Sequence, residues 1–345
     1  MQTVDLQTLD KQVALAGLMK RDYSFYILNG IFLLLWFFLS LFLVTVWDYF
    51  LLQLINCFFL WFIRLQAGLF AHDLSHQQVF KSKKINSFSA SCMWSTCCWL
   101  GAWYWENKHN SHHKNTNQIG QDPDLTIPFA FDRKQLWEST YFFKKFILPY
   151  QHIIFFVALP FTFFSTFFYS ALWLIKEYKS KKALFELFII VMSFWFYSFF
   201  IFSYLSWYNA LILLIGHLLV SGMYMGISFS PNHYGVPIID EDDEYQRVYQ
   251  ITTSRNIKGK SITSFFLWGL NYQIEHHLYP TMPRSRYEKA NSMVKEFCRE
   301  HKIQYHQVGF FKSFAEIFMA LKKVAKMETV KIERTPVLNP IWKEI

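Results

Sequence analysis

The stretch YILNGIFLLLWFFLSLFLVTV (residues 26–46) decides the fold class, because it contains no charged side chain. At a rise of about 1.5 Å per residue, a helix of this length crosses the roughly 30 Å hydrocarbon core of a bilayer. A second stretch, YFLLQLINCFFLWFIRLQAGLF (49–70), follows a short turn at Asp48 and contains one charge, Arg64. We expect two transmembrane helices here. An arginine inside a span is either paired or functional, or it reaches toward the lipid headgroups.

Four further apolar runs follow along the chain. Residues 187–204 and 205–229 are long and separated by a turn near residues 203–207. Residues 87–104 form a shorter run that is rich in Ser, Cys and Trp, and residues 151–175 form a run interrupted by Pro160. The first pair resembles the opening spans in length and composition, whereas the second pair does not.

Basic residues sort these runs across the bilayer, since Lys and Arg concentrate on the cytoplasmic side of membrane proteins. They cluster at residues 20–21, 81–84 and 176–182, and the turns at residue 48 and residues 203–207 carry none. This pattern predicts four transmembrane helices with both termini cytoplasmic. The runs 87–104 and 151–175 then begin and end on the cytoplasmic side, as interfacial or re-entrant helices.

Composition agrees with an all-α integral membrane protein. Hydrophobic residues make up 53% and charged residues 17% of the 345 residues, against about 25% charged residues in soluble domains. We attribute the net charge of +9 to topology and expect no nucleic-acid partner. We expect one domain over residues 1–345: a cytoplasmic segment 1–25, a membrane region 26–229 that includes a cytoplasmic segment 71–150, and a cytoplasmic cap 230–345.

Three short histidine clusters hold seven of the twelve histidines: HDLSH (72–76), HNSHH (109–113) and QIEHH (273–277). Spacings of three and four place imidazoles on one helix face. In the four-span topology all three clusters lie on the cytoplasmic side. The alternative, a set of unrelated interfacial histidines, does not explain three such clusters in one chain.

So many imidazoles exceed the needs of one metal ion, so the clusters predict two. Imidazole suits Zn, Cu, Fe and Ni, but structural zinc usually brings cysteine. The five cysteines (57, 92, 97, 98 and 298) lie outside the clusters, and no HExxH motif is present. Iron with oxygen chemistry is therefore favoured, with copper left open.

Other polar residues are candidates for supporting roles. We expect His233, directly after the last span, to be a further ligand, and His217, about 24 Å deeper at helical rise, to be a packed or tunnel residue. Carboxylates commonly orient metal-binding imidazoles. The candidates are Asp73, Glu106, Asp122, Asp124 and Glu275, and the surface histidines are His152, His301 and His306.

Taken together, these motifs resemble those of the membrane fatty acid desaturase family. The resemblance covers about residues 50–290 and rests on the three clusters, on DPD (122–124), on SRNI (254–257), and on GLNYQIEHHLYP (269–280) with MPR (282–284). A glutamine at the start of the third cluster is similar to the front-end subgroup. That subgroup inserts a double bond between an existing one and the carboxyl end.

The resemblance implies a centre of two iron ions that activates O2 and removes two hydrogens from an acyl chain. Carried over by position, the metal ligands are His72, His76, His109, His112, His113, His233, Gln273, His276 and His277. The sequence has no HPGG haem motif, which front-end members with a fused cytochrome b5 domain carry. We therefore expect a separate electron donor of the cytochrome b5 or ferredoxin type.

Several properties stay open at this point. The acyl chain could be carried on a lipid or on coenzyme A, and the membrane could be the endoplasmic reticulum or a bacterial inner membrane. A histidine-box hydroxylase or ketolase acting on another lipid is the nearest alternative. A metal transporter or sensor fits less well, because the spans contain few ionisable groups apart from Arg64 and His217.

Overall fold

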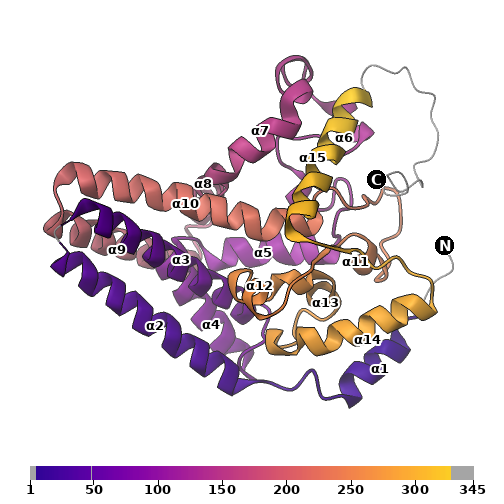
Figure 1. The fold of residues 1–345 in the computed structure, drawn as a ribbon, viewed down its shortest axis with the longest axis horizontal. Helices are drawn as coiled ribbons and strands as arrows, with labels where there is room; N and C mark the ends of the chain where they lie inside the picture. The colour runs from indigo at the N-terminus through magenta and orange to yellow at the C-terminus, as the bar shows by residue number, and fades with distance from the viewer. Residues whose placement is uncertain (1–4, 48, 328–345) are drawn as a thin grey trace.

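The computed structural model describes residues 5–47 and 49–327. Figure 1 shows a bundle of long helices that meets a cap of shorter ones. The α-helices of the described part are α1 (Gln7–Leu15), α2 (Tyr23–Val46), α3 (Phe50–Ser75), α4 (Lys83–Met93), α5 (Ala102–Lys114), α6 (Arg133–Glu138), α7 (Gln151–Ala158), α8 (Thr162–Lys176), α9 (Lys181–Tyr204), α10 (Trp207–His233), α11 (Tyr249–Thr252), α12 (Ser261–Phe266), α13 (Gln273–Leu278), α14 (Tyr287–Glu300) and α15 (Phe310–Met327).

The remaining elements are short. Two π-helical turns are η1 (Trp94–Cys98) and η3 (Phe143–Ile147). The 3-10 turns are η2 (Pro123–Leu125), η4 (Leu148–Tyr150), η5 (Leu159–Phe161), η6 (Leu270–Tyr272) and η7 (Arg284–Arg286). A parallel pair of two-residue strands, β1 (Asn256–Ile257) and β2 (Gln307–Val308), joins distant parts of the cap. The expected all-helical character is confirmed apart from this pair.

Five helices in the described residues are long and apolar enough to cross a membrane, one more than the four spans predicted. Four of them are α2, α3, α9 and α10, which contain the four predicted runs. The fifth covers residues 143–176, including the run that we expected to be interfacial or re-entrant. It is not uniform, because η3, η4, α7, η5 and α8 follow one another within it and Pro160 lies in the break at η5.

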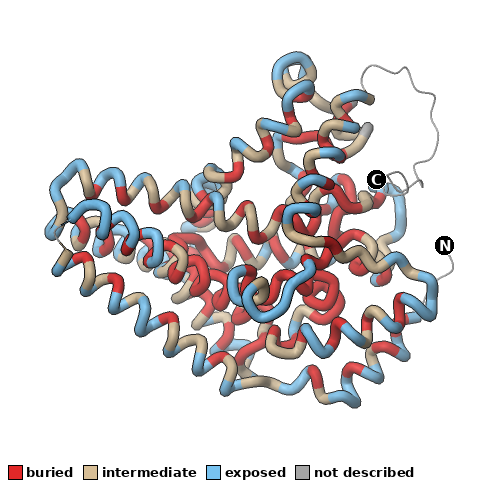
Figure 2. Tube along the Cα trace, in the orientation of Figure 1, coloured by how far each residue is buried: buried red, intermediate tan, exposed pale blue. Residues whose placement is uncertain are grey.

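Helix α3 is the central helix of the bundle. Its apolar window is 72% buried, whereas the windows of α2, α9 and α10 are 17%, 22% and 33% buried. Figure 2 shows burial concentrated where the bundle meets the cap, and exposure along α2 and α9. Outward-facing side chains of α2, such as Leu28, Leu35 and Phe38, are apolar and exposed. Such a surface is typical of contact with lipid.

The run 87–104 forms a hairpin rather than a span. Helix α4 continues into η1, the chain reverses at Trp99, which has φ 54°, and α5 runs back. Arg64 explains how this turn is stabilised: its Nε and Nη2 donate to the carbonyls of Cys97 and Thr96 at 2.9 and 3.2 Å. Arg64 is buried and its guanidinium lies 4.1 Å from the Trp99 ring. Arg64 therefore bonds carbonyls at a helix end. Such carbonyls lack a partner within the helix, and no water is available to them inside a bundle.

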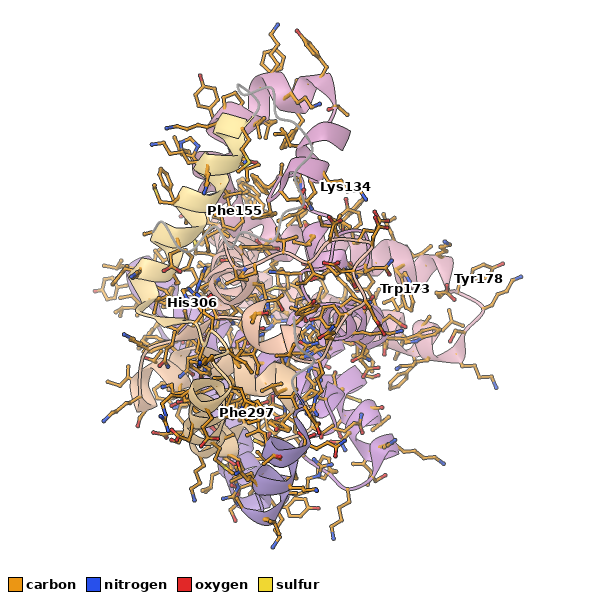
Figure 3. The ribbon with its side chains drawn as sticks, turned by 90° about the vertical axis from the view of Figure 1, so that its right-hand side faces the viewer. Lys134, Phe155, Trp173, Tyr178, Phe297 and His306 are labelled. Atoms are coloured by element: carbon orange, nitrogen blue, oxygen red, sulfur yellow. The ribbon has the colours of Figure 1, made fainter. Side chains whose placement is uncertain are left out.

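Helices of the cap take part in two apolar clusters. In the first, α1 packs against α14 through Leu9 and Val13. In the second, α15 packs against α7, and Phe155, labelled in Figure 3, lies between them with Ile317. Helix α12 packs against the long helices instead. Phe265 contacts α2 and α3, and the Phe266 carbonyl accepts from Tyr224 of α10.

Candidate metal centre

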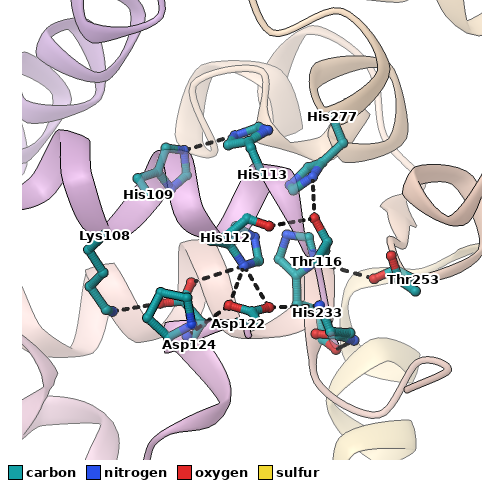
Figure 4. A network of polar contacts seen from close by, with 12 residues as sticks. Lys108, His109, His112, His113, Thr116, Asp122, Asp124, His233, Thr253 and His277 are labelled. Atoms are coloured by element: carbon teal, nitrogen blue, oxygen red, sulfur yellow. Dashed lines mark hydrogen bonds and ion pairs between the residues drawn. The ribbon is translucent and has the colours of Figure 1, made fainter. Parts of the chain in front are cut away.

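The three histidine clusters lie on helices that converge at one end of the bundle. His72 and His76 lie at the end of α3, His109, His112 and His113 on the last turns of α5, and His276 and His277 on α13. His233 is the last residue of α10. The structure thus brings all eight of the histidines predicted as ligands into one buried region. Figure 4 shows part of this region around His112.

The imidazoles form two groups. His72, His76, His109 and His276 make up the first group, and His112, His233 and His277 make up the second. Within each group one nitrogen from every ring lies within 4.8 Å of the others. His113 lies between the groups, with its ring 4.5 Å from that of His109 and 4.1 Å from that of His277.

The inward-facing nitrogens fit metal ions. The Nε2 atoms of His72, His76, His276 and His277 are buried and have no hydrogen-bond partner among the described residues. Buried polar atoms are normally paired, because leaving them unpaired costs free energy. The Nε2 atoms of His109 and His113 also lie 3.0 Å apart. Two nitrogens bonded at about 2.1 Å to one ion, at right angles, adopt about this separation.

Five of the Nδ1 atoms, in contrast, have partners, whereas the buried Nδ1 of His113 has none among the described residues. Such bonds fix the tautomer and orientation of metal-binding imidazoles. The pairs are His72 with Asp73 at 3.3 Å, His112 with Asp122 at 2.9 Å, His233 with the Thr253 carbonyl at 3.3 Å, His276 with the Tyr287 hydroxyl at 2.9 Å and His277 with Gln250 Oε1 at 2.8 Å. Five rings are therefore held with their other nitrogen pointing into the site.

Two of the predicted carboxylates, Asp73 and Asp122, contact histidine rings directly. Asp73 also pairs with Arg284 and accepts from Trp268 Nε1 at 3.3 Å, so it joins the first cluster to the MPR segment. Asp122 also accepts from the Asn117 backbone N–H at 2.7 Å. These bonds fix the carboxylates before any metal binds.

The other three candidates have different surroundings. Asp124 pairs with Lys108 at 2.6 Å and lies 3.5 Å from His112 Nδ1, at the edge of the site (Figure 4). Glu106 pairs with Lys182. Glu275 points away from the imidazoles and is bonded by three residues of the cap: Asn256, Asn291 and Tyr305. Glu275 therefore stabilises the cap and does not orient a histidine ring of the third cluster.

Sequence reasoning missed the partners that carry no charge. Tyr287 and Gln250 orient His276 and His277, and Thr116 lies 3.1 Å from His277 Nδ1. Tyr287 Oη also accepts from Gln78 Nε2 at 2.8 Å. Of these partners, only Thr116 has a sequence signal, since it follows His112 by one helical turn. Tyr287 and Gln250 reach the histidines through tertiary packing.

Gln273 lies beside the second group. Its Nε2 is 2.9 Å from His233 Nε2, and its Oε1 accepts from Asn232 at 3.1 Å. His217 lies outside both groups and stacks on Trp99 at 4.7 Å. The three histidines expected at the surface also lie outside them: His152 packs on Phe318, His301 on Phe297, and His306 pairs with Glu316.

Burial and charge set the protonation of these imidazoles. Burial, assisted by His112, lowers the pKa of His76 to about 3. Burial and neighbouring imidazoles also hold the pKa of His109, His113, His276 and His277 well below the usual range. Burial acts in the same direction on His112, but the carboxylates of Asp122 and Asp124 outweigh it and raise its pKa. Most rings are thus neutral near pH 7, which is the form that binds metals.

Comparison with known proteins decides the family. The model of the family described as fatty acid desaturase matches residues 46–309, a range that contains all three histidine clusters. The chain belongs to the fatty acid desaturase family. Together with the long apolar helices, this membership makes it a membrane protein.

Individual desaturases show the same relationship. An acyl-lipid (9-3)-desaturase of Physcomitrium patens is 31% identical over 277 residues, covering 76% of this chain and 51% of the relative. A delta(6)-fatty-acid desaturase of Caenorhabditis elegans is 31% identical over 276 residues, covering 76% and 62%. A delta(8)-fatty-acid desaturase of Euglena gracilis is 28% identical over 270 residues, covering 70% and 60%. The chain spans about half to two thirds of the length of these relatives.

An apolar cavity in this family member lies next to the first histidine group. It is lined by Leu65, Gly68, Leu69, Trp94, Cys98, Leu100, Phe163, Tyr224, Met225, Ser228 and Phe229. Trp94 stacks on Trp105 at 4.8 Å, and Trp105 stacks on His109 at 4.1 Å. Two indole rings therefore separate the cavity from the imidazoles. The site therefore places an apolar cavity beside a pocket lined by imidazoles.

Proposed function

We propose that this protein is an O2-dependent fatty acyl desaturase that uses two iron ions. One observation carries the proposal: two groups of buried imidazoles converge in a chain of this family, and the Nε2 atoms of His72, His76, His276 and His277 have no hydrogen-bond partner among the described residues. Two adjacent histidine-rich positions without thiolate suit iron and oxygen chemistry better than structural zinc.

The two groups assign the ligands. His72, His76, His109 and His276 would hold one ion, and His112, His233 and His277 the other, with His113 between them. Gln273 would join the second ion through its amide oxygen, which a 180° rotation of the amide would place toward His233. When bound, the iron pair supplies the activation of O2 and the removal of two hydrogens from adjacent methylenes.

The chain's own residues position the reactants. Asp73, Asp122 and Tyr287 hold the rings in place, so that the metal positions are set before substrate arrives. The cavity holds an apolar chain beside the first group, and the Trp94–Trp105 pair shields that group from the bilayer side. Such placement converts a difficult reaction into one between oriented partners in a dry site.

We infer that four helices cross the membrane: α2, α3, α9 and α10. The start of α9 lies beside α5, because Lys182 pairs with Glu106 at 3.2 Å and Glu186 accepts from the Trp103 N–H at 3.1 Å. Residues 115–180 would therefore leave and return on one side, which favours an interfacial position for the 143–176 segment. Both termini would be cytoplasmic, and residues 1–345 would form one domain in which α12 leaves the cap to reach the bundle.

The names of the relatives favour front-end chemistry, in which the new double bond lies on the carboxyl side of an existing one. Delta(6), delta(8) and acyl-lipid (9-3)-desaturases share 28–31% identity with this chain. Electrons would come from a cytochrome b5 or ferredoxin type donor. The enzyme would reside in the endoplasmic reticulum or in a bacterial inner membrane.

Expression in a host of defined lipid composition tests the proposal. The host is fed several polyunsaturated and saturated acyl chains, supplied with iron and an active electron donor, and its fatty acids are profiled by mass spectrometry. We expect a new unsaturated species that disappears in the His276→Ala variant. No new unsaturated species from an iron-loaded protein would contradict the proposal, and a hydroxylated or oxidised product would favour the hydroxylase or ketolase alternative.

A further inference from the structure

Helix α12 reaches an unexpected depth in the molecule. It belongs to the C-terminal part of the chain, yet the Phe265 ring packs against Phe32 of α2 and Phe62 of α3, with centroid distances of 6.1 and 5.9 Å. Phe62 precedes His72 by ten residues in one helix, which places this contact about 15 Å below the histidine level. The short helix therefore extends from the cap to the depth of the hydrocarbon core.

The surface composition of this segment fits a lipid environment. Ile262, Phe265 and Phe266 are 77%, 41% and 50% exposed. Lys258 and Lys260 come directly before the helix and are exposed as well. Exposed apolar side chains next to lysines are typical of segments that enter the acyl region while their cations stay among the phosphates.

A polar latch connects α12 to two of the long helices. Gln66 of α3 donates from Nε2 to the Tyr224 hydroxyl at 2.7 Å and to the Phe265 carbonyl at 3.0 Å. Tyr224 of α10 in turn donates to the Phe266 carbonyl. Gln66 is buried in an apolar helix, where a side-chain amide is costly unless it is bonded. These bonds specify that α12 rests against α3 and α10.

The latch lies at the open side of the cavity. Tyr224 both takes part in the latch and lines the cavity, and Met225 and Phe229 line it from the same helix. These three side chains are partly exposed, whereas the α3 residues that line the cavity are buried. No residue of the cap from position 234 onward is among those lining residues. The cavity is therefore accessible from the side of α10, at the depth of the bilayer.

We propose that α10 and α12 frame a lateral portal through which an acyl chain of a bilayer phospholipid enters the cavity. This inference rests on the proposed function and specifies the carrier as a membrane phospholipid. Lys258 and Lys260 lie at the level of its phosphate, and the Gln66–Tyr224 latch controls the distance between α12 and α10. An aliphatic chain that enters this way meets Met225 first and then the Trp94 wall beside the histidines.

A block of the portal tests the proposal in the full-length protein reconstituted in nanodiscs. Met225→Trp adds volume at the portal, and Met223→Trp is the matched control, because Met223 lies two residues away on α10 and is 37% exposed. The probe is a phosphatidylcholine whose acyl chain carries a mid-chain diazirine. Photolysis and peptide mass spectrometry then locate the labelled residues, with no need for turnover. Should Met225→Trp fail to fold, Met225→Phe gives a smaller block.

We expect labelling of the cavity residues Leu69 and Trp94 in the wild type and in Met223→Trp, and a loss of this labelling of at least about tenfold in Met225→Trp, in line with the cost of filling an apolar pocket. Conversion of the phospholipid-borne chain should fall in parallel. Wild-type labelling of Leu69 and Trp94 in Met225→Trp would overturn the proposal. Equal conversion of an acyl-coenzyme A by the wild type and by Met225→Trp, without conversion of phospholipid, would overturn it too.

The same experiment separates this inference from the function on which it rests. Portal labelling that depends on Met225, in an iron-loaded protein that desaturates neither carrier, would leave the portal in place and remove the desaturase assignment. A second variant tests the latch: Tyr224→Phe removes the hydroxyl with little change in volume. We expect its labelling of the cavity residue Leu69 to rise about twofold or more, because one hydrogen bond no longer holds α12. Unchanged labelling would overturn the role of the latch.

Discussion

The two halves of the histidine pocket differ in how their imidazoles are held. Both groups consist of imidazoles, but the outer partners in the first group are the neutral Tyr287 hydroxyl and Asp73, whose charge Arg284 neutralises. In the second group, the partner of His112 is Asp122, which forms no ion pair with Lys or Arg among the described residues, and the group lies beside the amide of Gln273. The rings of the first group are thus held by neutral or neutralised partners. In the second group, His112 is held by a carboxylate that keeps its charge. We expect the two metal positions to respond differently to the same kind of change.

The largest effect should come from the first group. His276→Ala removes one of four converging nitrogens and leaves a void between His72 and His76. We expect turnover to fall more than about 100-fold, because residues that act as a unit lose function together. We expect the iron content to fall by about half, since the second group is intact. Metal analysis by mass spectrometry and acyl profiling measure the two effects, with His301→Ala as a control outside the site.

Full activity in His276→Ala would remove this residue from the ligand set. Loss of both ions in that variant would show that the two groups bind metal as one unit, which would end the distinction drawn between them.

Acid should weaken the metal-free fold chiefly through the histidines whose pKa is lowered. His76 takes up a proton near pH 6.5 when unfolded but only near its pKa of about 3 when folded. Its neutral form therefore stabilises the fold above pH 6.5, and this contribution is lost as the pH falls toward 3. At pH 5 the loss is about 2 kcal/mol for this one group.

Denaturation of the chelator-treated protein in detergent at pH 7 and pH 5 measures this effect. His112 should act in the opposite sense, because Asp122 and Asp124 raise its pKa and its charged form is stabilised by folding. Replacing His112 by Gln should therefore steepen the loss of stability between pH 7 and 5. A metal-free protein of equal stability at both pH values would contradict the burial argument.

Asp122→Asn should act on the second group alone. The change keeps the shape of the side chain but removes the negative charge that faces His112 Nδ1. We expect metal affinity at this position to fall about 10- to 100-fold, as when other outer partners of metal-binding histidines are changed. Titration with Fe(II), followed by competition with a chelator of known affinity, measures it. Asp243→Asn, on the exposed 240–244 segment, is the control, and equal loss from both groups would contradict the assignment.

Tyr287→Phe should give the smallest effect. It removes the hydroxyl that pairs with His276 Nδ1 and accepts from Gln78. Because this partner is neutral, we expect a loss of about tenfold or less in metal affinity of the first group. Tyr305→Phe is a matched control, since that hydroxyl bonds Glu275 and contacts no imidazole in the described residues. A larger loss in Tyr287→Phe than in Asp122→Asn would reverse the ranking of the two halves.

The sequence predicted the site better than it predicted the surroundings of the site. Apolar runs and histidine spacing follow from helix geometry, so α3, α10 and the gathering of the eight histidines were accessible from local patterns. Tyr287 and Gln250 were not, because neither has a charge or a spacing that connects it to a histidine. Tertiary packing alone brings them to the site.

The placement of short or interrupted segments was harder to predict from the sequence. Ser261–Phe266 is too short and too polar at its start to signal contact with a bundle, so α12 was expected within the cap. Residues 143–176 are apolar enough to be a fifth long helix, although Pro160 and two 3-10 turns interrupt them. Hydropathy identifies apolar segments, but the position of a short segment depends on contacts such as those of Gln66 with α12.

The metal content of the purified protein tests the central claim most directly. We predict two iron ions per chain after reconstitution with Fe(II), one for each histidine group, as measured by inductively coupled plasma mass spectrometry against protein concentration. A chain that binds a single ion, or that retains zinc and excludes iron, would contradict the account.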